Sequence, residues 1–150
     1  MRTIIQRVSQ AQVEIGNKIV ASQNSGFLIL LGITHSDETK DIIWLTRKIT
    51  GMRVFEDEAG KMNHSIKDTG GDIIVVSQFT LFASTKKGNR PSFLDAAKPE
   101  KAEPLYQEFC QKLSTSLGKP VKTGHFGAMM EITLTNSGPV TISLDSQNPE

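Results

Sequence analysis

Apolar and polar residues alternate through the first third of the chain, which is typical of extended structure. The apolar positions among polar neighbours are Ile5, Val8, Val13 and Ile15. A Gly16-Asn17 pair follows, and Ile19 and Val20 come after it. A period of two indicates a strand with one buried face, and Gly-Asn favours a tight turn. This segment therefore predicts a β-hairpin.

Two runs of consecutive apolar residues predict strands that are buried on both faces. One is GFLILLGI, residues 26–33, and the other opens DIIVVSQFTLF, residues 72–82. Strands inside a parallel or mixed sheet carry apolar side chains on both faces. The second run becomes polar in its back half, where the strand should leave the core.

Two segments have the spacing of amphipathic helices. Ser36 is expected to cap the first, with Asp37 in its opening turn, and the second is expected to begin near Pro99 and to end at Gly118. The core-facing positions are Ile42, Leu45 and Ile49 in the first helix and Leu105, Phe109 and Leu113 in the second.

The other segments complete a pattern of many strands and few helices. Residues 52–57 predict a short strand before a turn at Gly60, and the tail, residues 121–144, predicts two more strands. Such a set packs as a curled, mostly antiparallel or mixed sheet with both helices on one side. The prediction is an α/β (α+β) fold in a single domain, residues 1–150.

The composition is that of an ordinary globular protein. Lys and Arg total 17 against 16 Asp and Glu, so the formal net charge is +1 and nucleic-acid contact would need a local basic patch. The single cysteine, Cys110, excludes an internal disulfide and suggests a reducing compartment. The longest apolar run, residues 27–31, is too short to span a bilayer. We expect a soluble cytoplasmic protein.

The familiar catalytic templates do not fit this sequence. His35, His64 and His125 are scattered, and none has a second ligand at the spacing of a metal site. The sequence has no glycine-rich phosphate loop and no nucleophile elbow. We therefore expect neither a metal nor a cofactor.

The polar stretch from Ser77 to Thr80 is the first candidate site. Backbone N–H groups and hydroxyls at a strand end can face a ligand. Thr80 is a candidate nucleophile, although the sequence shows no base to activate it. The simpler explanation is that Ser77, Gln78 and Thr80 alternate outward along the strand.

Two other stretches are unusual for their positions. Gly138-Pro139 leads directly into an alternating strand, although proline lacks the N–H that a sheet uses. A turn between two strands would also explain this pair. Lys86, Lys87 and Arg90 share one loop, where they either contact phosphates or lie solvated.

Together these stretches resemble the signature motifs of the D-aminoacyl-tRNA deacylases. The two signatures are SQFTLFASTKKGNRPSF at 77–93 and NSGPVT at 136–141. Segments 6–13, 52–66 and 124–136 are also similar to that family, so the resemblance runs nearly end to end.

The resemblance implies an enzyme that hydrolyses the ester between a D-amino acid and the 3′ end of tRNA, and that also acts on Gly-tRNA. It implies a three-layer fold and a homodimer with its active sites at the subunit interface. The Gly138-Pro139 bond would be cis and would reach into the pocket of the other subunit, around residues 77–80.

The resemblance also implies roles for single residues. Backbone N–H groups of Phe79 and Thr80 would orient the ester and stabilise its oxyanion, beside Ser77 and Gln78. The main chain of the Gly138-Pro139 pair would sense the handedness of the substrate. The remaining assignments are Asn136, Arg7 and Met129 in support of the pocket, and Lys86, Lys87 and Arg90 as tRNA contacts.

Two alternatives stay open. A related deacylase with a trans Gly138-Pro139 bond would act on a small L-amino acid carried by tRNA. A non-catalytic RNA-binding module would use the basic loop alone. DNA and membranes are not expected partners.

Overall fold

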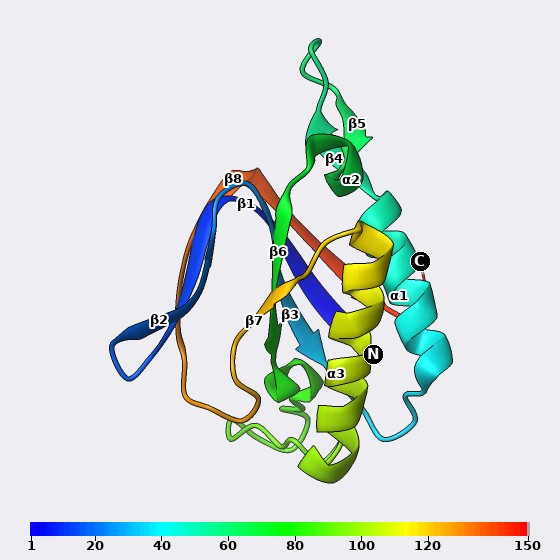
Figure 1. Cartoon of the computed structure of the whole chain (residues 1–150). Coiled ribbons are helices and arrows are strands. Elements are labelled where there is room, and N and C mark those ends of the chain that lie inside the picture. Colours follow the sequence, from blue (N-terminus) through cyan, green and yellow to red (C-terminus); the bar gives the residue numbers. More distant parts are fainter. Residues whose placement is uncertain (150) are drawn as a thin grey trace.

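A curled sheet of six strands is covered on one face by two long helices (Figure 1). The computed structural model describes residues 1–149. The strands are β1 (Arg2–Ile15), β2 (Lys18–Gln23), β3 (Gly26–Gly32), β4 (Arg53–Glu56), β5 (Met62–Ser65), β6 (Asp72–Ser77), β7 (Lys122–Thr123) and β8 (Glu131–Asp145). The helices are α1 (Thr39–Gly51), α2 (Ile66–Thr69), the 3₁₀ helix η1 (Phe79–Phe82) and α3 (Pro99–Leu117).

The sheet is mixed, as the sequence predicts. Its order is β2-β1-β3-β6-β7, and β8 pairs with β1. The pairs of β1 with β2, β3 and β8 are antiparallel, whereas β3–β6 and β6–β7 are parallel. Strands β4 and β5 form a separate hairpin that extends away from the sheet (Figure 1). The predicted mixed, curled sheet with two main helices on one side is confirmed.

Two apolar cores lie on opposite faces of the central strands. On β6, Ile73 and Val75 join the cluster that includes α1 and α3, while Ile74 and Val76 join a second cluster with Val13. Successive side chains of a strand point to opposite faces, so the apolar runs on β3 and β6 serve both cores. The prediction that these two strands are buried on both faces is confirmed.

The first helix begins later than the sequence predicts. Its N-cap is Glu38, whose backbone N–H donates to Asp41 Oδ2 at 2.8 Å, so the prediction of a Ser36 cap is wrong. Asp37 instead turns inward, where it accepts hydrogen bonds from the Thr34 N–H at 2.7 Å and from the amino group of Met1.

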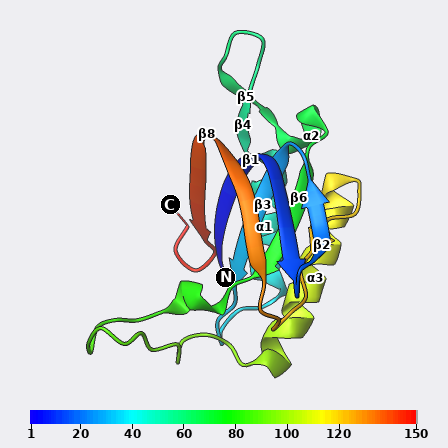
Figure 2. The same cartoon turned by 90° about the vertical axis from the view of Figure 1, so that its left-hand side faces the viewer.

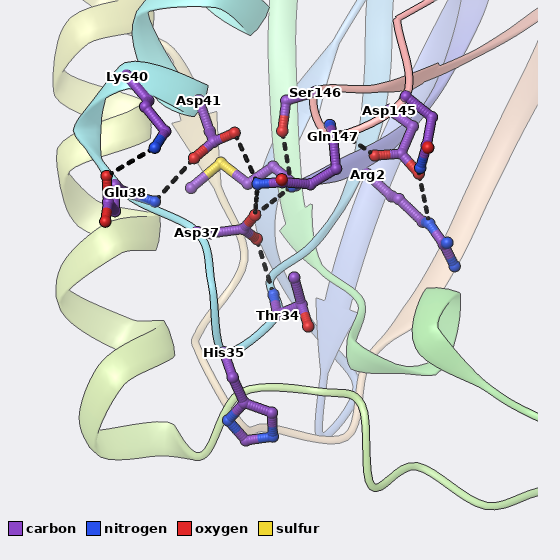
Figure 3. Close-up of polar contacts among 12 residues, drawn as sticks. Arg2, Thr34, His35, Asp37, Glu38, Lys40, Asp41, Asp145, Ser146 and Gln147 are labelled. Atoms are coloured by element: carbon purple, nitrogen blue, oxygen red, sulfur yellow. Dashed lines mark hydrogen bonds and ion pairs between the residues drawn. The ribbon is translucent and has the colours of Figure 1, made fainter.

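This inward position of Asp37 ties both ends of the described chain to the start of α1 (Figure 3). Gln147 donates to Asp37 Oδ1 at 3.3 Å and to Asp41 Oδ1 at 3.0 Å, and Ser146 Oγ accepts from the amino group of Met1 at 2.8 Å. The long-range ion pair between Asp37 and the amino group of Met1 thus outweighs the local sequence pattern that predicts a cap at Ser36.

The segment after β6 differs from its prediction, whereas the tail has the two strands predicted for it. The strand stops at Ser77, and residues 79–82 form η1 instead of continuing outward as a strand. In the tail, β7 has only two residues and β8 is one strand of fifteen, so Gly138-Pro139 is not a turn between two strands. None of the helices within residues 1–149 is long and apolar enough to cross a membrane.

Candidate active site

A mostly apolar cavity of about 590 Å³ opens where β6 ends. Ser77, Gln78 and Phe79 form one wall, the start of α3 forms another, and residues 126–130 close a third side. Ile132 and Val76 line its floor from β8 and β6. The structure therefore brings Ser77, Gln78, Phe79 and Met129 together around one hollow.

Two free backbone donors stand at the junction of β6 and η1. The Gln78 N–H is used by the Leu31 carbonyl at 2.8 Å and the Leu81 N–H by the Gln78 carbonyl at 3.2 Å. The N–H groups of Phe79 and Thr80, between them, have no hydrogen-bond acceptor among residues 1–149. The opening turn of a helix leaves such N–H groups unpaired and gives them a partial positive charge.

Thr80 contacts the cavity through Gln78. The Gln78 side-chain amide donates to Thr80 Oγ1 at 2.5 Å, and Thr80 itself is not among the residues that line the hollow. Within the described part of the chain, no histidine or carboxylate lines the cavity. A nucleophilic Thr80 would therefore have no base beside it.

The rim of the cavity exposes large apolar side chains. Phe79 is 55% exposed and Met129 is 92% exposed. Phe79 also meets Phe93 edge to face, with ring centroids 5.1 Å apart. Large apolar side chains that are exposed together commonly mark a binding surface. The rim is therefore suited to an aromatic or apolar ligand group.

A buried tyrosine on α3 packs against Phe126, one of the residues that line the cavity. The Tyr106 hydroxyl donates to the Val75 carbonyl at 2.9 Å, and its ring lies 5.8 Å from that of Phe126. Burial raises the pKa of Tyr106 well above its usual range, and burial raises the pKa of the neighbouring Cys110 to about 12. Both groups therefore stay protonated and serve packing.

Gly138-Pro139 lies in a wide bulge of β8. Val8 pairs with Asn136 and Gln6 pairs with Thr141, so four residues of β8 stand opposite one residue of β1. The bond is cis, the isomer that the resemblance implies and not that of the trans alternative. Asn136 braces the bulge, since its Oδ1 accepts from the Val140 N–H at 3.0 Å and its Nδ2 donates to Thr141 Oγ1 at 2.9 Å.

Arg7 holds the other side of this bulge. Its Nε donates to the Ser137 carbonyl at 3.1 Å, and its Nη1 donates to the Val54 carbonyl at 2.5 Å. Gly138 has φ +126°, and a Cβ there would lie 2.9 Å from Arg7 Nη2. Glycine is needed at this position because both the dihedral angle and the space exclude a side chain.

The bulge and the cavity are far apart within one chain. Ser77 aligns through Leu31 with Thr3 of β1, whereas Gly138 lies opposite Arg7, four residues further along and on the far side of β1. Strand spacings place the two groups on the order of 15–20 Å apart. Gly138 and Pro139 are exposed at the surface. They do not line the cavity of their own chain.

The predicted tRNA contacts lie in the long connection between η1 and α3. Lys86, Lys87 and Arg90 are all exposed there, and Figure 2 shows this connection extending away from the sheet. The Ser84–Ser92 bridge closes its base, which starts beside the cavity wall. The three basic side chains therefore lie on this exposed connection and not inside the cavity.

Sequence reasoning missed two features of these sites. Phe93 was not singled out, although its place within the 77–93 signature was a usable signal. The Val54 carbonyl was also missed, because every residue has a backbone carbonyl and the sequence does not show which one accepts from Arg7.

Comparison with known proteins shows the family to which this fold belongs. The chain belongs to the family described as D-Tyr-tRNA(Tyr) deacylase, whose profile matches residues 4–145. The resemblance read from the sequence is therefore confirmed.

Individual relatives agree with this family. The D-aminoacyl-tRNA deacylases of Flavobacterium psychrophilum and Cytophaga hutchinsonii are 59% and 56% identical to this chain, each over 100% of both sequences. A solved structure of the c-Myc DNA Unwinding Element Binding Protein is 40% identical, with a TM-score of 0.91 over 97% of this chain and 98% of its own. A probable eukaryotic D-amino acid tRNA deacylase shares the fold, at 17% identity and a TM-score of 0.83 over 95% and 97% of the two chains.

Proposed function

We propose that this chain, acting as one domain over residues 1–150, hydrolyses the ester that joins a D-amino acid to the 3′ end of tRNA. The observation that carries the proposal is the pair of Phe79 and Thr80 N–H groups, which are unpaired among residues 1–149, at the edge of an apolar cavity that Phe79 lines. Donors in this arrangement suit the oxyanion that forms when an acyl carbon is attacked. The names of the relatives support the same substrate class.

The chemistry requires little from protein side chains. Water adds to the ester carbonyl carbon, the bond to the 3′ oxygen breaks, and that oxygen takes a proton, leaving a free amino acid and tRNA. An aminoacyl ester is already activated, and its neighbouring 2′-hydroxyl assists the water. The protein then mainly orients the ester and stabilises negative charge on oxygen, which fits a cavity without a lining base.

A second copy of the chain would complete the site. Gly138 and Pro139 are exposed and lie far from the cavity of their own chain. Among residues 1–149, strand β8 pairs only with β1, and an unpaired edge along a strand of fifteen residues favours pairing or cover. In a homodimer the exposed bulge of one copy enters the cavity of the other, beside the apolar rim at Phe79 and Met129.

Handedness would be sensed by main chain. The carbonyl oxygens of the Gly138-Pro139 unit accept from the α-ammonium group, which every aminoacyl ester carries. With the amine and the ester carbonyl both fixed, an L side chain meets the backbone of the pocket and a D side chain points to open space. Rejection of L substrates is therefore steric, and one pocket serves many D-amino acids.

The basic loop would position the tRNA without reading its sequence. Lys86, Lys87 and Arg90 are exposed on a connection that starts beside the cavity. Contacts of such side chains with acceptor-stem phosphates give binding that weakens with salt.

A side-by-side hydrolysis assay tests the proposal. D-Tyr-tRNA, L-Tyr-tRNA and Gly-tRNA are incubated with the protein, and the remaining ester is measured with time. We expect rapid loss of D-Tyr-tRNA, measurable loss of Gly-tRNA because glycine has no side chain to reject, and L-Tyr-tRNA decay at the buffer rate. Equal rates on the D and L esters would contradict the handedness proposal, and RNA binding without hydrolysis would favour the non-catalytic alternative.

A further inference from the structure

We propose that the β4–β5 hairpin is a positioning element for the Gly138-Pro139 bulge, and that Glu56 acts in it by holding the charge of Arg7. This inference rests on the proposed function, because it gives the hairpin a part in sensing the handedness of the substrate. The hairpin belongs to neither the cavity nor the bulge, yet Arg7 joins it directly to the bulge.

Three groups hold the Arg7 guanidinium. Nη1 donates to the Val54 carbonyl of β4 at 2.5 Å, Nε donates to the Ser137 carbonyl of the bulge at 3.1 Å, and Nη2 lies 3.7 Å from Glu56 Oε1. The Arg7 side chain is only 8% exposed. A nearly buried cation favours a counter-charge, and Glu56, whose side chain is 57% exposed, is the carboxylate paired with it.

The base of the hairpin is rigid enough to position Arg7. Phe55 is buried, and its ring lies 5.1 Å from that of Phe27 on β3. Val54 belongs to the same core, and Ser65, which pairs with Arg53 at the base of the hairpin, caps α2. The hairpin base therefore moves with the sheet, and Arg7 transmits its position to Ser137.

The space around Arg7 makes its position adjustable. A cavity of about 220 Å³ lies beside it, lined also by Ser9, Glu56 and Ser137. A guanidinium without its counter-charge can swing into this space. Since Arg7 Nη2 lies where a Gly138 Cβ would nearly touch it, such a swing alters the room beside Gly138.

The test compares two charge reversals on the same hairpin. Glu56→Lys places a cation next to Arg7, while Glu58→Lys makes the same change of net charge at an exposed position that has no ion pair with Arg7 among residues 1–149. Hydrogen exchange of the backbone N–H groups of residues 136–141, all but Pro139, reports the order of the bulge without any substrate. The ratio of the hydrolysis rates on D-Tyr-tRNA and L-Tyr-tRNA reports the consequence for discrimination.

We expect Glu56→Lys to speed exchange in residues 136–141 and to lower the D-to-L rate ratio roughly tenfold, since small misplacements cost large factors in rate. Glu58→Lys should leave both within about twofold of the parent protein. The milder Glu56→Gln variant should change both in the same direction, which guards against misfolding of the reversal.

Unchanged exchange in both Glu56 variants would overturn the inference, whatever the activity. Faster exchange with an unchanged D-to-L ratio would overturn the part played in specificity. A parent protein inactive on every ester would instead refute the proposed function, and exchange alone would still decide whether Glu56 and Arg7 position the bulge.

Discussion

Gln78 donates a hydrogen bond from its side-chain amide to the hydroxyl oxygen of Thr80, across 2.5 Å. The Thr80 oxygen thus accepts a hydrogen bond, whereas a nucleophilic hydroxyl must also donate its own proton to a base. Within residues 1–149, Gln78 is the only side chain that hydrogen-bonds this hydroxyl, and an amide cannot act as that base.

Thr80→Ala should therefore remain active. We expect the rate on D-Tyr-tRNA to fall by less than about tenfold, because loss of a true nucleophile or its base typically costs 10²-fold or more. Single-turnover hydrolysis with saturating enzyme measures this. Complete inactivity with intact tRNA binding would show that the hydroxyl is essential.

Gly138→Ala should severely reduce activity. Its φ of +126° disfavours any side chain, and the new Cβ would lie 2.9 Å from both Arg7 Nη2 and Val140 Cγ2. We expect kcat/KM on D-Tyr-tRNA to fall by roughly 10²-fold. Gly60→Ala is the matched control, since Gly60 also has a positive φ but open space around it. Similar losses in both variants would point to general backbone strain.

Removal of the loop cations should change the salt dependence of tRNA binding. For Lys86→Ala with Lys87→Ala, we expect the slope of log K against log salt to become shallower by about 0.7–0.9 for each phosphate that a lysine no longer neutralises. The rate at saturating enzyme should hardly change. Lys67→Ala, on α2 at the opposite end of the molecule (Figure 1), is the charge control. An unchanged slope in the double variant would place the RNA elsewhere.

Asp37→Asn should destabilise the fold. Asp37 is 1% exposed and pairs with the amino group of Met1, which is also buried. Removing one member of a buried ion pair leaves the other uncompensated, at a cost of about 3–5 kcal/mol. Urea denaturation measures the free energy of unfolding. Lys40→Gln, which breaks the exposed pair of Lys40 with Glu38, should change that energy little.

Cys110 should be unreactive in the native protein. Burial raises the pKa of its thiol to about 12, so almost no thiolate is present at pH 8. We expect a disulfide reagent to modify Cys110 only at the rate of unfolding. The raised pKa also means that stability contributed by the neutral thiol is present below pH 9.0 and is lost as pH rises toward 12. Rapid labelling of the native protein at pH 8 would contradict this.

The sequence predicts those parts of the fold that depend on local patterns. Strands β3 and β6 follow from their unbroken apolar runs, and α3 follows from its spacing and from Gly118, which ends it in the left-handed conformation. Long-range contacts explain the errors. Asp37 leaves the predicted helix because it pairs with Met1, and η1 replaces the strand that the apolar run before Ser77 predicts to continue.

In the candidate site, too, local motifs are predicted from the sequence and features that depend on long-range contacts are not. Motif resemblance identifies Ser77, Gln78 and Met129, and the structure places these side chains around one cavity. The free N–H groups of Phe79 and Thr80 are visible only after the backbone turns into η1. Neither the contact from Arg7 to Val54 nor the distance from Gly138 to the cavity can be read from residue spacing, since both depend on strand order.

The bulge in β8 also limits where β8 can tolerate the insertion or deletion of a residue. Ile132 and Leu134, before the bulge, pack on one core, and Ile142 and Leu144, after it, pack on the other. A strand that gains or loses one residue turns every later side chain to the opposite face. A single-residue insertion or deletion between 136 and 141 would therefore expel one apolar pair into water, unless the bulge absorbed it by losing its shape.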